Sequence, residues 1–337
     1  MSTYKKEVGT GVQNNAGDYT GAVEGQLWYN STAGSFQFRS FTTAGTWATG
    51  GNLNTARWGL ASAKLGTQTA ALAFAGNTGP APTTVTESYD GTSWTELNDI
   101  NTSRNTSTGF GTATAAIVTG GVPPPAGISN TESWNATCWS EVGDLNQGRF
   151  QISGTGTNTL GLVFGGVYEP SPPTTIVTGA TESWNGTSWT EVNDLNLVRY
   201  GVGAAGTQTA ALGFGGSQPF PLPITANTEQ WNGTCWTEVN DLNAVRTSTT
   251  GAGHTDTAAM SMGGNSPTAV ALTELWNGTC WSEDTDLNTA REYLAGAGTT
   301  ASALAFGGVL PPGTAITAAT EEWIGAGAPV TETITTS

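Results

Sequence analysis

The chain has 337 residues, of which 10 are Lys or Arg and 26 are Asp or Glu, so its formal net charge is −16. This acidic balance excludes a basic nucleic-acid-binding surface, and no run of about 18 apolar residues is present that could insert into a membrane. The 47 glycines weigh against a helical bundle, whereas 13 Trp and 10 Phe provide enough apolar surface for a folded core.

The first 43 residues stand apart from the rest because they lack the repeat described below. Two lysines near the start are not followed by an apolar segment, so we expect no secretory signal and synthesis in the cytoplasm. Residues 25–39 predict a small β-hairpin. Its aromatic side chains are Trp28, Tyr29, Phe36 and Phe38. A hairpin of this size does not fold alone, so we expect residues 1–43 to attach the chain to a partner or to oligomerise it.

The hairpin segment Gly-Gln-Leu-Trp-Tyr-Asn-Ser-Thr-Ala-Gly-Ser-Phe-Gln-Phe-Arg (25–39) resembles a short module of tailed-bacteriophage structural proteins, particularly fibre proteins of marine phages. The resemblance implies that residues 1–43 contact other virion proteins. Low charge and a β-rich composition of Gly, Thr, Asn and Ser are typical of virion appendages and fit this expectation.

A repeat of 45 to 50 residues organises residues 44–325. The phrase Thr-x-Trp ends at Trp94, Trp139, Trp189, Trp236 and Trp281, with a shortened copy at Trp47. Each unit also holds a Gly/Ala/Ser-rich segment, an apolar run closed by a glycine pair, and a Thr-Glu-x-aromatic segment. These segments predict four short strands per unit, and a period near 47 residues is typical of propeller blades.

Five junctions between the third and fourth strands carry Asp90-Gly91, Asn135-Ala136, Asn185-Gly186, Asn232-Gly233 and Asn277-Gly278. Asn-Gly and Asp-Gly favour two-residue type I′ hairpins, in which both central residues have positive φ. The Gly/Ala/Ser-rich strand is expected to be innermost, where the least space is available.

Six copies of each element predict an all-β, six-bladed β-propeller. The chain enters the repeat with an outer-type strand around Trp47 and leaves it after Trp323. Pairing of these two strands would complete the last blade and close the ring without an exposed edge. We therefore expect a propeller over residues 44–325 and a C-terminal tail over 326–337.

The pattern resembles the kelch repeat. A glycine pair is followed by an aromatic residue with Asp or Asn, as in Tyr89-Asp90, then by a tryptophan five residues on, as in Trp94, and then by an arginine. The resemblance implies a kelch-like propeller fold and says little about function, since such propellers serve enzymes, adaptors and adhesins. Most units carry Trp where kelch repeats usually have Tyr.

Six of the seven arginines occupy one repeat position: Arg57, Arg104, Arg149, Arg199, Arg246 and Arg291. They could form a charged ring for a ligand, or each could pair with a carboxylate of its own or a neighbouring blade. We favour structural pairing, because a residue needed once for chemistry need not recur in every blade, whereas a packing residue should.

The chemistry-bearing residues do not predict an enzyme. His254 is the single histidine, and the three cysteines lie in different units, so neither a histidine-based triad nor a zinc site is expected. We predict no catalytic residue, no metal and no cofactor. The unrepeated carboxylates, such as Glu169 and Asp256, form no pair at a recognisable spacing.

Fourteen of the 15 prolines lie between the glycine pair and the Thr-Glu strand, in connections that vary while the framework repeats. These connections should share one face, and variable loops on a rigid scaffold often bind partners. The longest are 167–179 and 217–226. Candidate binding residues within them are Tyr168, Glu169, Phe220 and Leu222. Alternatively, the prolines only stiffen solvent-exposed loops.

The combined expectation is a non-enzymatic bacteriophage virion protein, oligomeric in the particle. It would belong to a tail fibre or surface appendage and bind a host surface glycan or another virion protein through its loop face. A capsid or tail decoration protein without a receptor role is the first alternative. A polysaccharide-acting enzyme with paired carboxylates is the second.

Overall fold

The computed structural model describes residues 12–17, 19, 26–41, 44–123, 126–171, 174–221, 223–326 and 329–334. The chain divides into two compact units, one formed by Met1–Gly45 with Ile324–Ser337 and the other by Thr46–Trp323. The described residues form strands, turns and bends, and none forms a helix long and apolar enough to cross a membrane. The protein is all-β.

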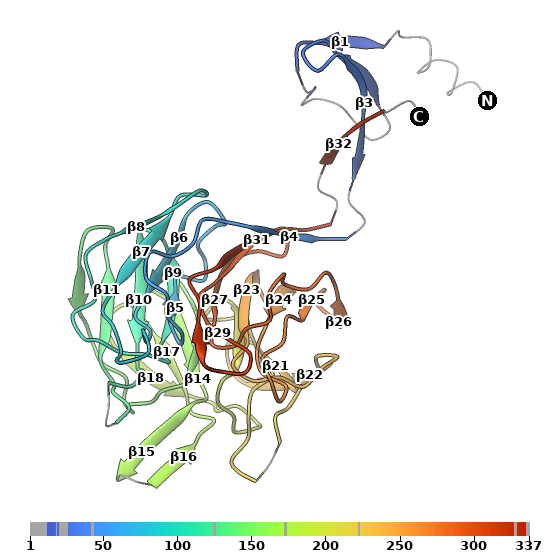
Figure 1. The fold of residues 1–337 in the computed structure, drawn as a ribbon. Helices are drawn as coiled ribbons and strands as arrows, with labels where there is room; N and C mark the ends of the chain where they lie inside the picture. Colours follow the sequence, from blue (N-terminus) through green and yellow to red (C-terminus); the bar gives the residue numbers. More distant parts are fainter. Residues whose placement is uncertain are drawn as a thin grey trace. The chain divides into compact units, whose positions relative to one another are not determined.

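Within the described part of Thr46–Trp323, six four-stranded antiparallel sheets repeat one plan (Figure 1). The first strands are β5 (Ala61–Ser62), β9 (Thr108–Thr112), β13 (Ser153–Gly156), β19 (Gly203–Gly206), β23 (Thr250–Thr255) and β27 (Ala295–Gly298). The second strands are β6 (Ala71–Phe74), β10 (Ala115–Thr119), β14 (Gly161–Phe164), β20 (Ala211–Phe214), β24 (Ala258–Met262) and β28 (Ser302–Phe306).

The third strands carry the Thr-Glu-x-aromatic sequence. They are β7 (Thr86–Tyr89), β11 (Thr131–Trp134), β17 (Thr181–Trp184), β21 (Thr228–Trp231), β25 (Thr273–Trp276) and β31 (Thr320–Ile324). The outer strands are β8 (Trp94–Glu96), β12 (Trp139–Glu141), β18 (Trp189–Val192), β22 (Trp236–Val239), β26 (Trp281–Glu283) and β4 (Thr46–Thr49). First strands of successive sheets contact one another, so the Gly- and Ala-rich segments are innermost, as predicted.

The last sheet has the order β27-β28-β31-β4, so its outer strand comes from the start of the unit. The predicted pairing of the strand around Trp47 with the strand ending at Trp323 is thereby confirmed. The two indole rings lie with their centroids 5.2 Å apart. This pairing covers an edge of β31 that would otherwise expose unpaired backbone groups.

The apolar core lies between neighbouring sheets. In five of the six junctions a phenylalanine of one sheet packs edge-on against the outer-strand tryptophan of the next, as Phe164 does against Trp236 at 4.7 Å. Four of these phenylalanines lie on second strands, and Phe110 lies on the first strand β9. The same tryptophans donate a hydrogen bond from Nε1 to the threonine hydroxyl that opens the third strand of the preceding sheet, as Trp236 does to Thr181 at 3.1 Å. Each sheet is thus fixed to the next by an apolar and a polar contact.

The hairpins between third and outer strands differ from the two-residue type I′ turns expected. In the third sheet Trp184 pairs with Trp189, so the loop has four residues. The Asn185 side chain accepts hydrogen bonds from the N–H groups of Thr187 and Ser188, both at 2.9 Å, and only Gly186 has positive φ, at +91°. An Asx turn therefore replaces the type I′ turn.

Two of the variable connections contain short hairpins that were not predicted from the sequence. β15 (Val167–Ser171) pairs with β16 (Thr174–Val177), and β29 (Val309–Leu310) pairs with β30 (Ala315–Ile316). The β15–β16 hairpin extends away from the sheets (Figure 1). Val and Ile on both sides of each turn favour extended backbone over irregular structure.

The other unit contains a sheet of order β1-β2-β3-β32, formed by β1 (Gln13–Asn15), β2 (Leu27–Asn30), β3 (Ser35–Phe41) and β32 (Pro329–Thr333). β2 and β3 make the hairpin that the sequence predicted. The C-terminal residues, expected as a separate tail, contribute β32, which runs antiparallel to β3. Pairing with β3 satisfies backbone groups along a strand that would otherwise form the edge.

The hairpin turns lead to a test of backbone strain. Ala136 occupies the position of Gly186 with φ +71°, a conformation that costs a non-glycine residue about 1–2 kcal/mol. Part of this cost is offset by the greater entropy that glycine gives the unfolded chain. We expect Ala136→Gly to raise the free energy of unfolding by about 0.5–1 kcal/mol in urea denaturation.

Gly186→Ala is the matched control and should lower the free energy of unfolding by a similar amount. A Cβ built at Gly186 meets no atom closer than 3.4 Å, so backbone conformation alone decides the result. Equal signs for the two substitutions would contradict the assignment of strain to Ala136.

Candidate functional site

Every repeat arginine is buried and paired with the glutamate on the third strand of its own sheet. The pairs are Arg57–Glu87, Arg104–Glu132, Arg149–Glu182, Arg199–Glu229, Arg246–Glu274 and Arg291–Glu321. In the Arg149 pair, Nη2 lies 2.7 Å from Oε1 of Glu182. The arginine lies in the connection before the innermost strand, and its side chain is fully buried. These charges are therefore used within the fold.

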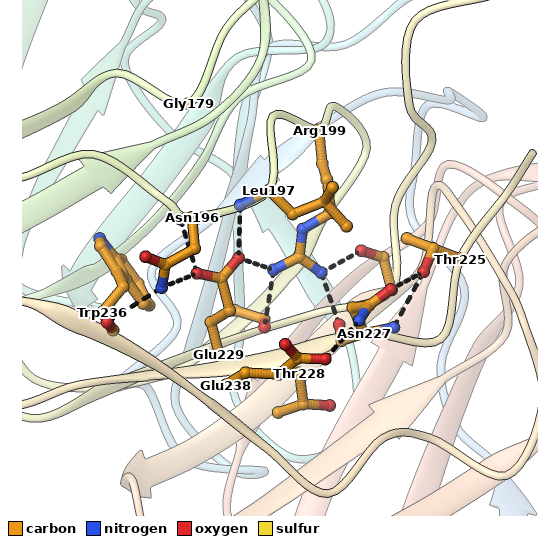
Figure 2. A network of polar contacts seen from close by, with 12 residues as sticks. Gly179, Asn196, Leu197, Arg199, Thr225, Asn227, Thr228, Glu229, Trp236 and Glu238 are labelled. Atoms are coloured by element: carbon orange, nitrogen blue, oxygen red, sulfur yellow. Dashed lines mark hydrogen bonds and ion pairs between the residues drawn. The ribbon is translucent and has the colours of Figure 1, made fainter. Parts of the chain in front are cut away.

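Figure 2 shows one complete network, around Arg199 and Glu229. Asn196 donates from its backbone N–H and from Nδ2 to Oε2 of Glu229, at 2.7 and 2.8 Å, and its Nδ2 also donates to the Trp236 carbonyl at 3.0 Å. Arg199 Nη1 donates to the carbonyl oxygens of Gly215 and Asn227. Glu229 thus accepts hydrogen bonds from Asn196 and Arg199, which lie at the two ends of one short segment, and fixes this segment to the sheet that contains Glu229.

The asparagine three residues before each arginine recurs in all six units, but the sequence analysis did not single it out. Asn54, Asn101, Asn146, Asn196, Asn243 and Asn288 each donate to the glutamate of the following sheet. The constant spacing Asn-x-x-Arg is the sequence feature from which these asparagines could have been recognised. The aspartate two residues before five of these asparagines has another role. Asp194, for example, accepts a hydrogen bond at 3.1 Å from the N–H of Thr181, which opens the third strand.

Burial dominates the electrostatics of the arginines. Desolvation lowers the pKa of Arg57 to about 10, although the Glu87 carboxylate opposes the shift. The pKa of each of the other five is lowered for the same first reason. A buried pair of this kind adds little net stability, but removing one partner leaves an uncompensated charge.

A second set of repeated residues surrounds the axis on which the innermost strands converge. It lies two positions after each arginine: Gly59, Thr106, Gln151, Gly201, Ser248 and Tyr293. All six have φ between +49° and +63°. Each N–H donates to the carbonyl oxygen of the preceding member, at 2.7 to 3.1 Å, and Gly59 donates to Tyr293. Four non-glycine residues thus hold a strained conformation at one place.

The side chains of Gln151 and Tyr293 meet across this ring, where Nε2 of Gln151 donates to the Tyr293 hydroxyl at 3.2 Å. Burial raises the pKa of the Tyr293 phenol. The described residues around the axis also line a cavity of about 90 Å³, to which all six sheets contribute. Neither Gln151 nor Tyr293 was predicted as a site residue, since their backbone conformation is not visible in the sequence.

The predicted loop residues lie on the connections of neighbouring sheets. Tyr168 and Glu169 are half-buried on β15, whereas Phe220 is 98% exposed. Leu222 lies outside the described residues. Phe220 therefore offers a large apolar side chain to solvent.

The predicted attachment residues lie on β2 and β3. Trp28 is fully buried, and Tyr29 packs edge-on against Phe36 at 5.2 Å. Phe36 remains 46% exposed, and Phe38 is half-buried.

No family model and no curated protein matches the sequence. Among solved structures, one titled "Structure of YjhT" is similar to this chain with a TM-score of 0.65 and 13% sequence identity. The similarity covers 80% of this chain and 95% of that one. At this identity the comparison shows the fold alone, a repeated-blade, propeller-like structure.

The buried pair can be tested by removing one charge. Glu182→Gln leaves the Arg149 guanidinium buried without its counter-ion, and we expect the free energy of unfolding to fall by about 3–5 kcal/mol. Urea denaturation measures the change. Glu191, which pairs in register with Glu182 on β18 and is exposed, provides the control. Glu191→Gln should change stability by less than about 0.5 kcal/mol, and equal losses for both would contradict the special role of Glu182.

Proposed function

We propose that the six repeated sheets are the blades of a closed six-bladed, kelch-type β-propeller. Three contacts that recur between successive sheets also join the last sheet to the first, which supports closure. Trp94 donates to Thr320, Gly308 donates to the Arg57 carbonyl, and Gly59 donates to the Tyr293 carbonyl, at 2.9 Å in each case. The first-to-last junction is therefore built like the internal ones.

We infer that this propeller is a non-enzymatic recognition module. The observation that carries this inference is the burial of all six repeat arginines and their glutamates, which leaves none of them for substrate chemistry. The variable connections, by contrast, carry exposed apolar side chains such as Phe220 and Ile176. Apolar and aromatic side chains on loops of a rigid scaffold suit the binding of a sugar face or of another protein.

The setting we propose is a bacteriophage virion, on a tail fibre or surface appendage. The resemblance of residues 25–39 to fibre modules supports it, and the sheet that includes β2 and β3 would form the attachment site. Exposed Phe36 on this small sheet is suited to a contact with another virion protein. The loop face would then bind a host surface glycan or a neighbouring virion protein.

Replacement of residues 167–179 and 217–226 by short Gly/Ser links tests the role of the loops. The six arginines with their glutamates and asparagines, and the carbonyls of Ala180 and Asn227, lie outside these ranges, so the variant should keep its fold. Its melting temperature should fall because Val167, Ser217 and Thr225 are buried. We expect binding to host cells, or to purified virion protein, to fall at least tenfold in a pull-down titration.

The single substitution Phe220→Ser serves as a smaller perturbation and should weaken binding several-fold. Exchange of 265–271, a shorter connection in another sheet, is the matched control. Unchanged binding of the 167–179 and 217–226 variant would remove these loops from the account.

A further inference from the structure

The segment that follows the innermost strand of the first sheet, β5, contains an insertion. In five units the glycine that precedes the inner turn stands seven positions after the repeat arginine, as Gly206 does after Arg199. In the first unit it stands nine positions after, from Arg57 to Gly66. The additional residues are Lys64 and Leu65. Their backbone contacts the first strands on either side, since the Leu65 N–H donates to Gly111 at 2.9 Å and the Lys64 carbonyl accepts from Gly298.

This insertion puts a cation beside the axial cavity. Lys64 lines the cavity, and no Asp or Glu is among the described lining residues. Within Thr46–Trp323 the other cationic side chains are the six arginines, each paired with a glutamate. A chain with 26 acidic residues thus places one half-buried cation in a cavity wall that has no carboxylate among its described lining residues. A charge held partly out of water is expected to have a counter-charge.

Two serine hydroxyls belong to the same cavity wall. Ser107 and Ser248 both line the cavity and are 8% and 7% exposed. The Ser107 Oγ has no hydrogen-bond partner in the described structure, and the Ser248 Oγ has the Tyr293 hydroxyl as its neighbour. Buried hydroxyls normally have partners, so Ser107 can donate to a group bound in the cavity, and Ser248 can turn its hydroxyl toward the same group. Ser248 also belongs to the ring of residues with positive φ, a backbone conformation that is strained for a non-glycine residue and is often found at functional sites.

We propose that the axial cavity is a binding site for a small carboxylate, held by the Lys64 ammonium and by the hydroxyls of Ser107 and Ser248. One cation matches a monoanion, and the three donors match the lone pairs of two carboxylate oxygens. A cavity of about 90 Å³ admits a carboxylate group with a few carbon atoms. This site is separate from the loop face, and the proposal does not depend on the proposed function.

Calorimetric titration of the full chain with sodium acetate, against sodium chloride at equal ionic strength, tests the site. We expect saturable acetate binding to the unmodified chain. The affinity should fall at least tenfold in Lys64→Met, and in Lys64→Arg it should stay within threefold of that of the unmodified chain. Lys6→Met, which removes the same charge from the N-terminal segment, is the control and should bind acetate as the unmodified chain does. Glucuronate is the second ligand, and its exclusion would indicate a small free acid rather than the carboxylate of a sugar.

The melting temperature separates loss of the site from loss of the fold. Lys64→Met removes a half-buried charge that has no carboxylate beside it in the cavity wall, so without acetate its melting temperature should lie within a few degrees of that of the unmodified chain. Acetate should raise the melting temperature of the unmodified chain and leave that of Lys64→Met unchanged. Deletion of Lys64 and Leu65, which restores the seven-residue spacing, should also abolish binding. No acetate binding to the unmodified chain, or affinity within twofold in Lys64→Met, would overturn the proposal.

The pH dependence provides an independent readout. Burial lowers the pKa of Lys64 to about 8, so the ammonium is charged at neutral pH and is lost as the pH rises. The other titratable lining group, Tyr293, has a raised pKa and stays neutral over this range. Acetate affinity should therefore fall between about pH 8 and 10 in the unmodified chain and persist in Lys64→Arg. A flat profile in the unmodified chain would contradict the role of Lys64.

Discussion

The cost of placing an arginine in the protein interior governs the construction of this molecule. Each guanidinium loses its hydration at a junction between sheets, and it is accommodated only where a glutamate, an asparagine and several backbone carbonyls are all in position. The glutamate and the carbonyls belong to the sheet that the arginine leads into, and the asparagine lies in the connection before that sheet. The network therefore fixes each connection to the sheet that follows it, and the same requirement recurs in all six units. Apolar contacts between phenylalanine and tryptophan rings supply area at five of the six junctions between sheets.

Much of the fold could be predicted from the sequence because its information is local and repeated. Thr-Glu-x-Trp and Thr-x-Trp-Thr-Glu alternate with the period of a strand, and the displaced first strand around Trp47 indicated its pairing with the strand ending at Trp323. Three details were not accessible in the same way. The Asn185 side chain forms an Asx turn, which Asn-Gly alone does not distinguish from a type I′ turn. The C-terminal residues pair with β3, a contact between segments about 290 residues apart. Val and Ile around two loops form additional hairpins.

The candidate site was less accessible than the fold. The sequence identified the arginines and the loops, but it did not indicate that six residues two positions after the arginines share a left-handed backbone and meet around an axis. Thr106, Gln151, Ser248 and Tyr293 have nothing chemical in common, so only the coordinates group them. Lys64 could have been found, because the spacing from arginine to glycine is longer by two residues in its unit. Its significance depends on the cavity, which is formed by side chains far apart in the chain.

The repeated residues of the sheets and the residues that occur only once thus have different roles. The recurring arginine–glutamate pairs are buried and fix each connection to its sheet, so substitutions there change stability. Residues that occur once, such as Phe220 on a loop or Lys64 after the innermost strand β5, are exposed or half-buried and are available for ligands. This division follows from the physical cost of desolvation, since a polar group without an internal partner persists only where water or a ligand can reach it.

The central claim is that the buried arginine and glutamate act as one energetic unit at each junction. A double-mutant cycle on Arg149→Met and Glu182→Leu, followed by urea denaturation, measures this coupling directly. The account predicts that the double variant is more stable than the sum of the single losses implies by at least about 2 kcal/mol, because it leaves no unpaired buried charge. Losses that add to within about 0.5 kcal/mol would contradict it, since independent side chains behave in that way.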